Sequence, residues 1–220
     1  MARRSHRCGN GLVVNPDLKR FLDRQLVMLI FETAIGSATN DLSWSNSVGF
    51  HRSSDNDIIL AVEICHLYIS PGHNFFGHHG REPDNYAAVE VDSVQCVAGR
   101  GIRDDRFFDY RDDYKGQITF FSLEVFDELC SALQVQGVDP SSVRRNVLVR
   151  GVDLNSLIGK KFEVQGVHFY GTEESRPCHW MNDAVAAGTE EFLKGHGGLR
   201  ARILTDGVLK STSRVAANVE

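Results

Sequence analysis

From Ile58 onward the chain is a succession of short strand-like segments that are separated by tight turns. β-Branched and aromatic residues are frequent in these segments, and glycine, proline or aspartate follows several of them. The segments span residues 58–64, 66–69, 86–91, 93–97, 117–121, 143–150, 161–164, 167–170 and 201–204. Many short strands with few helices predict a closed or strongly curved sheet, in a mainly β fold of the α+β class.

Two helices and one hairpin are predicted within this pattern. Ser122 is a good N-cap residue, and one face of the helix that follows carries Val125, Phe126, Leu129 and Leu133. A second helix is expected over residues 181–194. Between two of the strands, Gln165-Gly166 predicts a tight hairpin turn.

Residues 1–57 differ in character from the rest, with a basic start and a polar, turn-rich end. We expect a poorly ordered extension over 1–57, a domain over 58–210 and a flexible tail over 211–220. The apolar run at 26–31 is too short to cross a bilayer and does not resemble a signal peptide, so no membrane association is expected. An organelle transit sequence and a misassigned start codon are alternatives for this region.

Composition narrows the class of protein further. With 220 residues and 42% hydrophobic content, the chain can bury a full core without disulfide support. Five scattered cysteines without a Cys-x-x-Cys pair fit a reducing cytoplasm. A formal net charge of -5 argues against general nucleic-acid binding, so any basic site must be local.

Cys178 is the candidate reactive residue. It lies between Pro177 and His179, with Arg176 close by in the sequence. A thiol acts as a nucleophile or metal ligand in its thiolate form, which neighbouring positive charges favour. The alternative is a buried structural cysteine, the more common role of a free cysteine.

Several separated motifs accompany this cysteine in a characteristic order. They are Gly101-Ile102-Arg103-Asp104-Asp105-Arg106, the 139–162 segment with Arg144-Arg145-Asn146, Pro177-Cys178, and the glycine-rich 195–202 segment. In this order they resemble the MOSC domain, the module of molybdenum cofactor sulfurases and stand-alone molybdopterin-dependent reductases. The resemblance covers about residues 59–209 and implies a MOSC-type β-barrel with a few peripheral helices.

The resemblance also implies a binding site for the molybdenum cofactor, molybdopterin. Cys178 would ligate molybdenum or carry sulfur, because a thiolate suits a soft, sulfur-rich metal centre. Arg144 and Asn146 would contact the cofactor from one face of a strand, and alternation would turn Arg145 the other way. The remaining cofactor-binding candidates are Arg106, Arg200 and Ser175. The glycines at 195–198 would let the backbone approach the phosphate.

By the same resemblance, the protein would reduce N-hydroxylated small molecules or carry sulfur through Cys178. The sequence has no flavin, iron–sulfur, nicotinamide or pyridoxal phosphate motif, so a separate electron-donor protein or cysteine desulfurase is expected as a partner. The alternative is a non-catalytic module that binds the cofactor or a partner through Arg144 and Arg200.

Two departures and one competing interpretation complete the sequence picture. Asp104 occupies a position where the family usually has glycine, and no Gly-Asp pair follows Leu209. His73, His78 and His79 in a glycine-containing loop could instead hold zinc, although their spacing matches no established metal motif. The alternating acidic and basic residues at 103–115 predict a solvated segment, and Trp180 is expected to pack beside the site.

Overall fold

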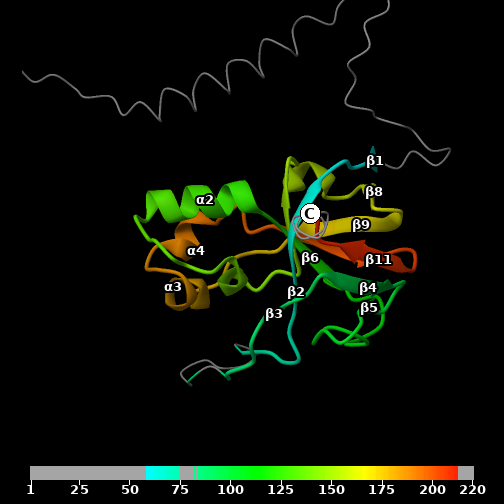
Figure 1. The fold of residues 1–220 in the computed structure, drawn as a ribbon, viewed down its shortest axis with the longest axis horizontal. Helices are drawn as coiled ribbons and strands as arrows, with labels where there is room; N and C mark the ends of the chain where they lie inside the picture. Colours follow the sequence, from blue (N-terminus) through cyan, green and yellow to red (C-terminus); the bar gives the residue numbers. More distant parts are fainter. Residues whose placement is uncertain (1–57, 75–81, 83, 213–220) are drawn as a thin grey trace, which may run out of the picture. The chain divides into compact units, whose positions relative to one another are not determined.

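The computed structural model describes residues 58–74, 82 and 84–212 (Figure 1). Contacts divide the chain into residues 1–46 and 47–220, and all described residues belong to the second unit. The proposed extension over 1–57 lies outside the described residues. Ser211 and Thr212 were expected to begin a flexible tail, but Ser211 is buried and both hydroxyls donate to the carbonyl of Ile64, so these two residues belong to the domain.

Eight strands form one curled sheet. Their order is β1 (Ile58–Ile59), β8 (Lys161–Val164), β9 (Val167–Glu174), β10 (Leu199–Ile203), β6 (Ile118–Ser122), β7 (Val147–Arg150), β2 (Glu63–Ile69) and β3 (Val89–Glu90). The β1–β8 and β6–β7 pairs are parallel, and the other neighbours are antiparallel. A second sheet has the order β11 (Gly207–Lys210), β4 (Ser93–Val97) and β5 (Gly101–Ile102). The predicted mainly β fold with a strongly curved sheet is confirmed.

The α-helices of the described residues lie on one side of the main sheet (Figure 1). They are α2 (Leu123–Ala132), α3 (Trp180–Ala184) and α4 (Thr189–Phe192). As predicted, Ser122 caps α2, and its hydroxyl accepts a hydrogen bond from Val125 N at 3.2 Å. The single helix predicted over 181–194 is wrong. The chain breaks between α3 and α4, where Gly188 has a φ of 94° that a continuing helix cannot include.

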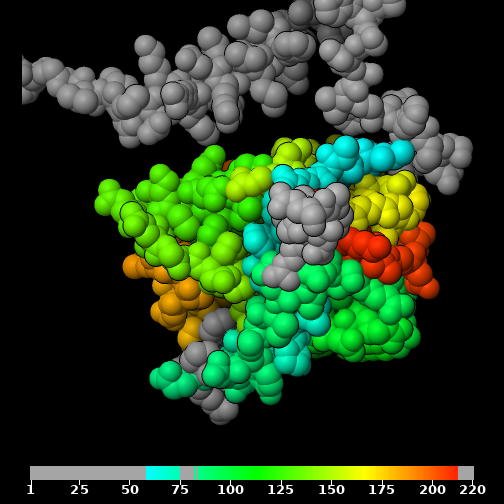
Figure 2. Space-filling model, viewed as in Figure 1, coloured from blue at the N-terminus to red at the C-terminus, as the bar shows by residue number. Residues whose placement is uncertain are grey.

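The two central strands β6 and β7 are buried on both faces. Phe120, Val147 and Val149 point into one core, which the curled sheet and the second sheet enclose. The alternate residues Phe121 and Leu148 point into a second core beneath α2. Packing against both cores therefore fixes the positions of β6 and β7, and with them the residues that immediately precede and follow each strand. Figure 2 shows α2 and the α3–α4 segment along one side of the molecular face.

The hairpin between β8 and β9 is confirmed. Gln165 and Gly166 both have positive φ, at 50° and 80°, as a tight type I′ connection requires. Two short 3₁₀ turns, η1 (Pro140–Val143) and η2 (Leu154–Leu157), complete the described elements. Among the residues described, no helix is long and apolar enough to cross a membrane.

Candidate functional site

A cavity of about 260 Å³ opens beside α3 and η1. Four arginines line it, together with Cys178 and Ser175. The arginines are Arg106, Arg144, Arg145 and Arg200. No aspartate or glutamate stands among the described residues of its lining. The structure thus brings together five of the six candidates from the sequence, and Asn146 is the exception.

Cys178 is exposed, whereas Cys65 and Cys96 are buried. It follows β9 in a segment without regular secondary structure that ends where α3 begins, and its carbonyl accepts a hydrogen bond from Met181 N at 2.9 Å. The segment is fixed upstream because Ser175 N donates to Gly198 O at 2.7 Å. Cys178 and the four arginines line the same cavity, so its thiol can contact a ligand that binds there. A cysteine buried in the hydrophobic core could not.

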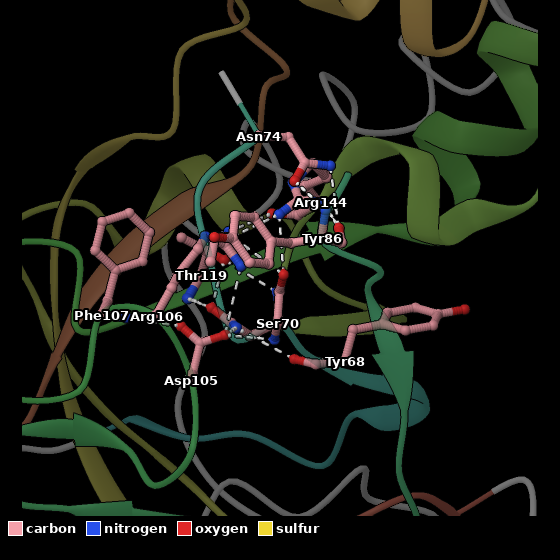
Figure 3. A network of polar contacts seen from close by, with 11 residues as sticks. Tyr68, Ser70, Asn74, Tyr86, Asp105, Arg106, Phe107, Thr119 and Arg144 are labelled. Carbon is pink, nitrogen blue, oxygen red and sulfur yellow. Dashed lines mark hydrogen bonds and ion pairs between the residues drawn. The ribbon is translucent and has the colours of Figure 1, made fainter. Parts of the chain in front are cut away.

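Arg144 does not lie on a strand, contrary to the sequence prediction. Asp139 caps η1 by accepting from Ser141 N at 2.8 Å, and the 3₁₀ turn ends at Arg144 in the left-handed region, with a φ of 52°. Strand β7 begins only at Val147, so strand alternation does not apply to residues 144–146. The Arg144 guanidinium donates to Tyr86 O, Ser70 Oγ and Gly72 O, each at 3.0 Å (Figure 3).

Asn146 lies behind the cavity wall, not in the cavity lining. Its Oδ1 accepts from both the backbone and the hydroxyl of Thr119, at 3.1 and 2.8 Å. Its Nδ2 donates to Tyr68 O and Asp105 Oδ1, each at 3.2 Å. These bonds use the full donor capacity of the amide. The expected shared face with Arg144 is therefore wrong, and Asn146 instead braces the residues behind the cavity.

Arg145 lines the cavity together with Arg144, although alternation predicted that it would point elsewhere. Its guanidinium donates to three carbonyls: Gly197 O at 3.2 Å, Val143 O at 2.9 Å and Ser175 O at 2.8 Å. Arg144, which precedes it, has a left-handed backbone conformation and changes the direction of the chain. Strand alternation therefore failed to predict where the Arg145 side chain points. Sequence reasoning missed this residue because a left-handed arginine has no simple sequence signal.

The 103–107 loop supplies Arg106 and Phe107 to the cavity. Asp105 was expected in a solvated segment, but it is buried, and its carboxylate accepts from Ser70 N and Phe107 N at 3.1 Å each. Arg106 approaches the same carboxylate at 3.4 Å. Asp104 has a φ of 66°, which explains why glycine suits this position and shows that aspartate can adopt the same turn.

Arg200 projects from β10 and pairs with Glu173 at 3.2 Å. The loop before it approaches other backbone closely. A Cβ on Gly197 would lie 2.4 Å from Ser175 O, and one on Gly198 would lie 2.3 Å from Phe120 O. These glycines therefore permit the packing of the loop against the cavity wall.

Aromatic rings form much of the remaining wall, with His73, Phe107 and Tyr114 in contact and Trp180 also present. Phe107 lies 4.7 Å from His73 and 5.2 Å from Tyr114, measured between ring centroids. Burial and the nearby Arg106 lower the pKa of His73. His78 and His79 lie outside the described residues, and no metal-binding cluster occurs in the described part of the chain.

Comparisons with known proteins agree with this architecture. A family model described as the MOSC domain matches residues 78–216. The chain is similar to the crystal structure of the YuaD protein from Bacillus subtilis, with a TM-score of 0.56 and 18% identity over 68% of this chain and 91% of that chain. It is also similar to YiiM from Geobacillus stearothermophilus, with a TM-score of 0.50 and 11% identity over 68% of this chain and 71% of that one.

A comparison with curated proteins gives no match. At such identities the two structural relatives support the fold alone. The family model, by contrast, spans more than half of the chain and includes the segments that carry Arg106, Arg144 and Cys178. The chain therefore belongs to the MOSC domain family.

Proposed function

We propose that this MOSC domain binds the molybdenum cofactor in the arginine-lined cavity, with Cys178 as a ligand of the metal. The observation that carries the proposal is the exposed thiol of Cys178 in a cavity with four arginines and no lining carboxylate among the described residues. The MOSC family is known as a domain that binds this cofactor, which supports the proposal.

The charge balance around the cavity favours an anionic ligand. Two of its arginines have carboxylate partners, in the pairs Arg106–Asp105 and Arg200–Glu173. Within the described part of the chain, no salt bridge joins Arg144 or Arg145 to a carboxylate. Burial lowers the pKa of each of these two guanidinium groups to about 10, and neighbouring arginines add to the effect. The phosphate of the cofactor would restore the balance.

The cavity also suits the planar, polar pterin. Phe107, Tyr114 and Trp180 provide flat apolar surfaces against which a ring system can pack. Ser142 also lines the cavity, and its Oγ is buried without a hydrogen-bond partner among the described residues. A cavity of about 260 Å³ is slightly smaller than most ligand sites, so the cofactor would fill it and extend from its mouth.

Cys178 would hold the metal because a thiolate is a soft ligand. When bound, the cofactor would supply two-electron redox chemistry at molybdenum, and the protein would bind and orient it. We propose two activities through this residue, reduction of N-hydroxylated small molecules or carriage of sulfur on Cys178. A separate electron-donor protein would serve the first activity, and a separate cysteine desulfurase would serve the second.

The test is expression of the full chain in a host that makes molybdopterin, followed by elemental analysis. We expect about one molybdenum per chain, together with reduction of a hydroxylamine or amidoxime in the presence of an artificial electron donor. Absence of both molybdenum and pterin from the purified protein would contradict the proposal. Bound cofactor without reductase activity, and with no sulfur transferred to Cys178, would instead favour a non-catalytic binding module.

A further inference from the structure

Two side chains on the cavity wall have polar groups without a hydrogen-bond partner in the described part of the chain. They are Arg145 and Ser142, which flank the end of η1. Arg145 is 9% exposed, and Ser142 Oγ is buried. Neither residue belongs to the set that the family resemblance assigns to the cofactor.

Arg145 donates three hydrogen bonds to the described residues, which use three of its five N–H groups. All three acceptors are neutral carbonyls on separate segments, so the guanidinium is held firmly while its charge has no salt-bridge partner among the described residues. A buried charge without a counter-charge is costly unless a ligand completes its environment.

Among the described residues, Arg145 and Arg144 lack the carboxylate ion pairs that Arg106 and Arg200 have. Arg106 and Arg200 are paired, and the Asp105 carboxylate also acts on Arg144. Burial is the main cause that lowers the pKa of Arg145, and the charges of Arg200 and Arg106 act in the same direction. Cys178 and Glu174 oppose this shift only in part. An anion would therefore stabilise the charge of Arg145, as it would that of Arg144.

Ser142 gives an independent indication. A buried hydroxyl without a partner costs free energy, and few such groups persist in folded proteins unless a ligand or water satisfies them. A guanidinium can bind two oxygens of a carboxylate or of a phosphate equally well. A hydroxyl donor from the same cavity wall would add a third contact, which suits an anion with at least three oxygens.

We propose that Arg145 and Ser142 form an oxyanion subsite for the tetrahedral phosphate group of a ligand. The subsite itself does not depend on the proposed function. Its assignment to the phosphate of the cofactor, as opposed to that of a phosphorylated small molecule, does rest on it.

Phosphate titration of the full chain, expressed in a host that cannot make molybdopterin, tests the subsite directly. Inorganic phosphate should raise the melting temperature in a saturable manner, because a ligand that binds only the folded state stabilises it. Acetate at equal ionic strength should have no such effect. Equal responses to phosphate and acetate would overturn the proposal.

Three variants make the test specific. Arg145→Lys keeps a charge but loses the fork of donors, and it should weaken phosphate binding about tenfold or more. Ser142→Ala should fold normally, because it removes an unsatisfied hydroxyl, and it should weaken phosphate binding. Arg150→Met is the matched control, since Arg150 pairs with Asp127 outside the cavity, and its phosphate response should match the wild type. Unchanged phosphate affinity in folded Arg145→Lys and Ser142→Ala would overturn the subsite.

The source of the phosphate is resolved by repeating the titration on cofactor-loaded protein. Loss of the phosphate response on loading would assign the subsite to the phosphate of the cofactor. A response that survives loading would support the subsite and assign it to a phosphorylated small molecule. Failure of the chain to take up cofactor would contradict the proposed function and leave the titration of the cofactor-free chain interpretable.

Discussion

Asn146 Nδ2 donates a hydrogen bond to Asp105 Oδ1 over 3.2 Å, which joins the residues before β7 to a loop 41 positions earlier in the sequence. Arg145 adjoins Asn146 and Arg106 adjoins Asp105, so this bond fixes the spacing between two of the cavity arginines. The network of polar contacts in Figure 3 links the cavity-lining residues Arg106 and Arg144 to the buried residues Asp105 and Ser70. Asn146 and Asp105 act through the cavity residues that they hold.

Asn146→Ala should lower the free energy of unfolding of the cofactor-free protein by about 1–3 kcal/mol. The substitution leaves the buried partners in Thr119 and Asp105 with unsatisfied polar groups. Urea unfolding measures the change, and Asn155→Ala, which removes one exposed amide contact, should cost less than about 0.5 kcal/mol. Normal stability combined with poor cofactor uptake would show instead that Asn146 touches the cofactor.

Gly198→Ala should destabilise the domain more than Gly195→Ala. Both glycines have positive φ, at 94° and 80°, so each substitution incurs backbone strain of about 1–2 kcal/mol. Only at Gly198 would the new Cβ meet another atom, Phe120 O at 2.3 Å, while nothing lies within 4 Å at Gly195. Thermal unfolding of the two variants compares them, and equal losses would disprove the clash.

His73 should make the domain less stable as the pH falls below about 6.5. Burial, followed by the charge of Arg106, lowers the pKa of this imidazole from its usual value of 6.5. The unfolded chain therefore takes up a proton at a higher pH than the folded chain, and stability decreases on acidification through this window. His73→Gln should flatten the dependence of melting temperature on pH between 7 and 5 (about the range in which histidine titrates).

The matched control for that experiment is His196→Gln, which changes an exposed histidine outside the arginine-lined cavity. It should retain the slope of the wild type. A His73→Gln variant with the same slope as the wild type would contradict the assignment.

Cys178→Ser should abolish molybdenum retention or turnover while it changes the unfolding free energy by less than about 0.5 kcal/mol, because the side chain is exposed. Elemental analysis and a reductase assay measure the first effect, and urea unfolding measures the second. Cys130→Ser, which lies outside the cavity on α2, should retain full metal content. Equal molybdenum content and turnover in both variants would remove Cys178 from the site.

Local sequence signals predicted much of the fold. Ser122 marked the start of α2, and the Gln165-Gly166 turn was identified, because caps and tight turns depend on neighbouring residues alone. The break between α3 and α4 was missed. Gly188 is a weak local signal, and tertiary packing decided that the chain turns there.

The sequence by itself indicated most of the strands, the order of the family motifs and Cys178 as the candidate reactive residue, because these depend on side-chain type and short-range spacing. Only the tertiary structure decided which arginines face the cavity. The left-handed turn at Arg144 placed Arg145 in the lining and Asn146 behind it, and buried Asp105 gathered segments that are distant in sequence. Such contacts arise from three-dimensional packing around a buried charge, which local patterns do not encode.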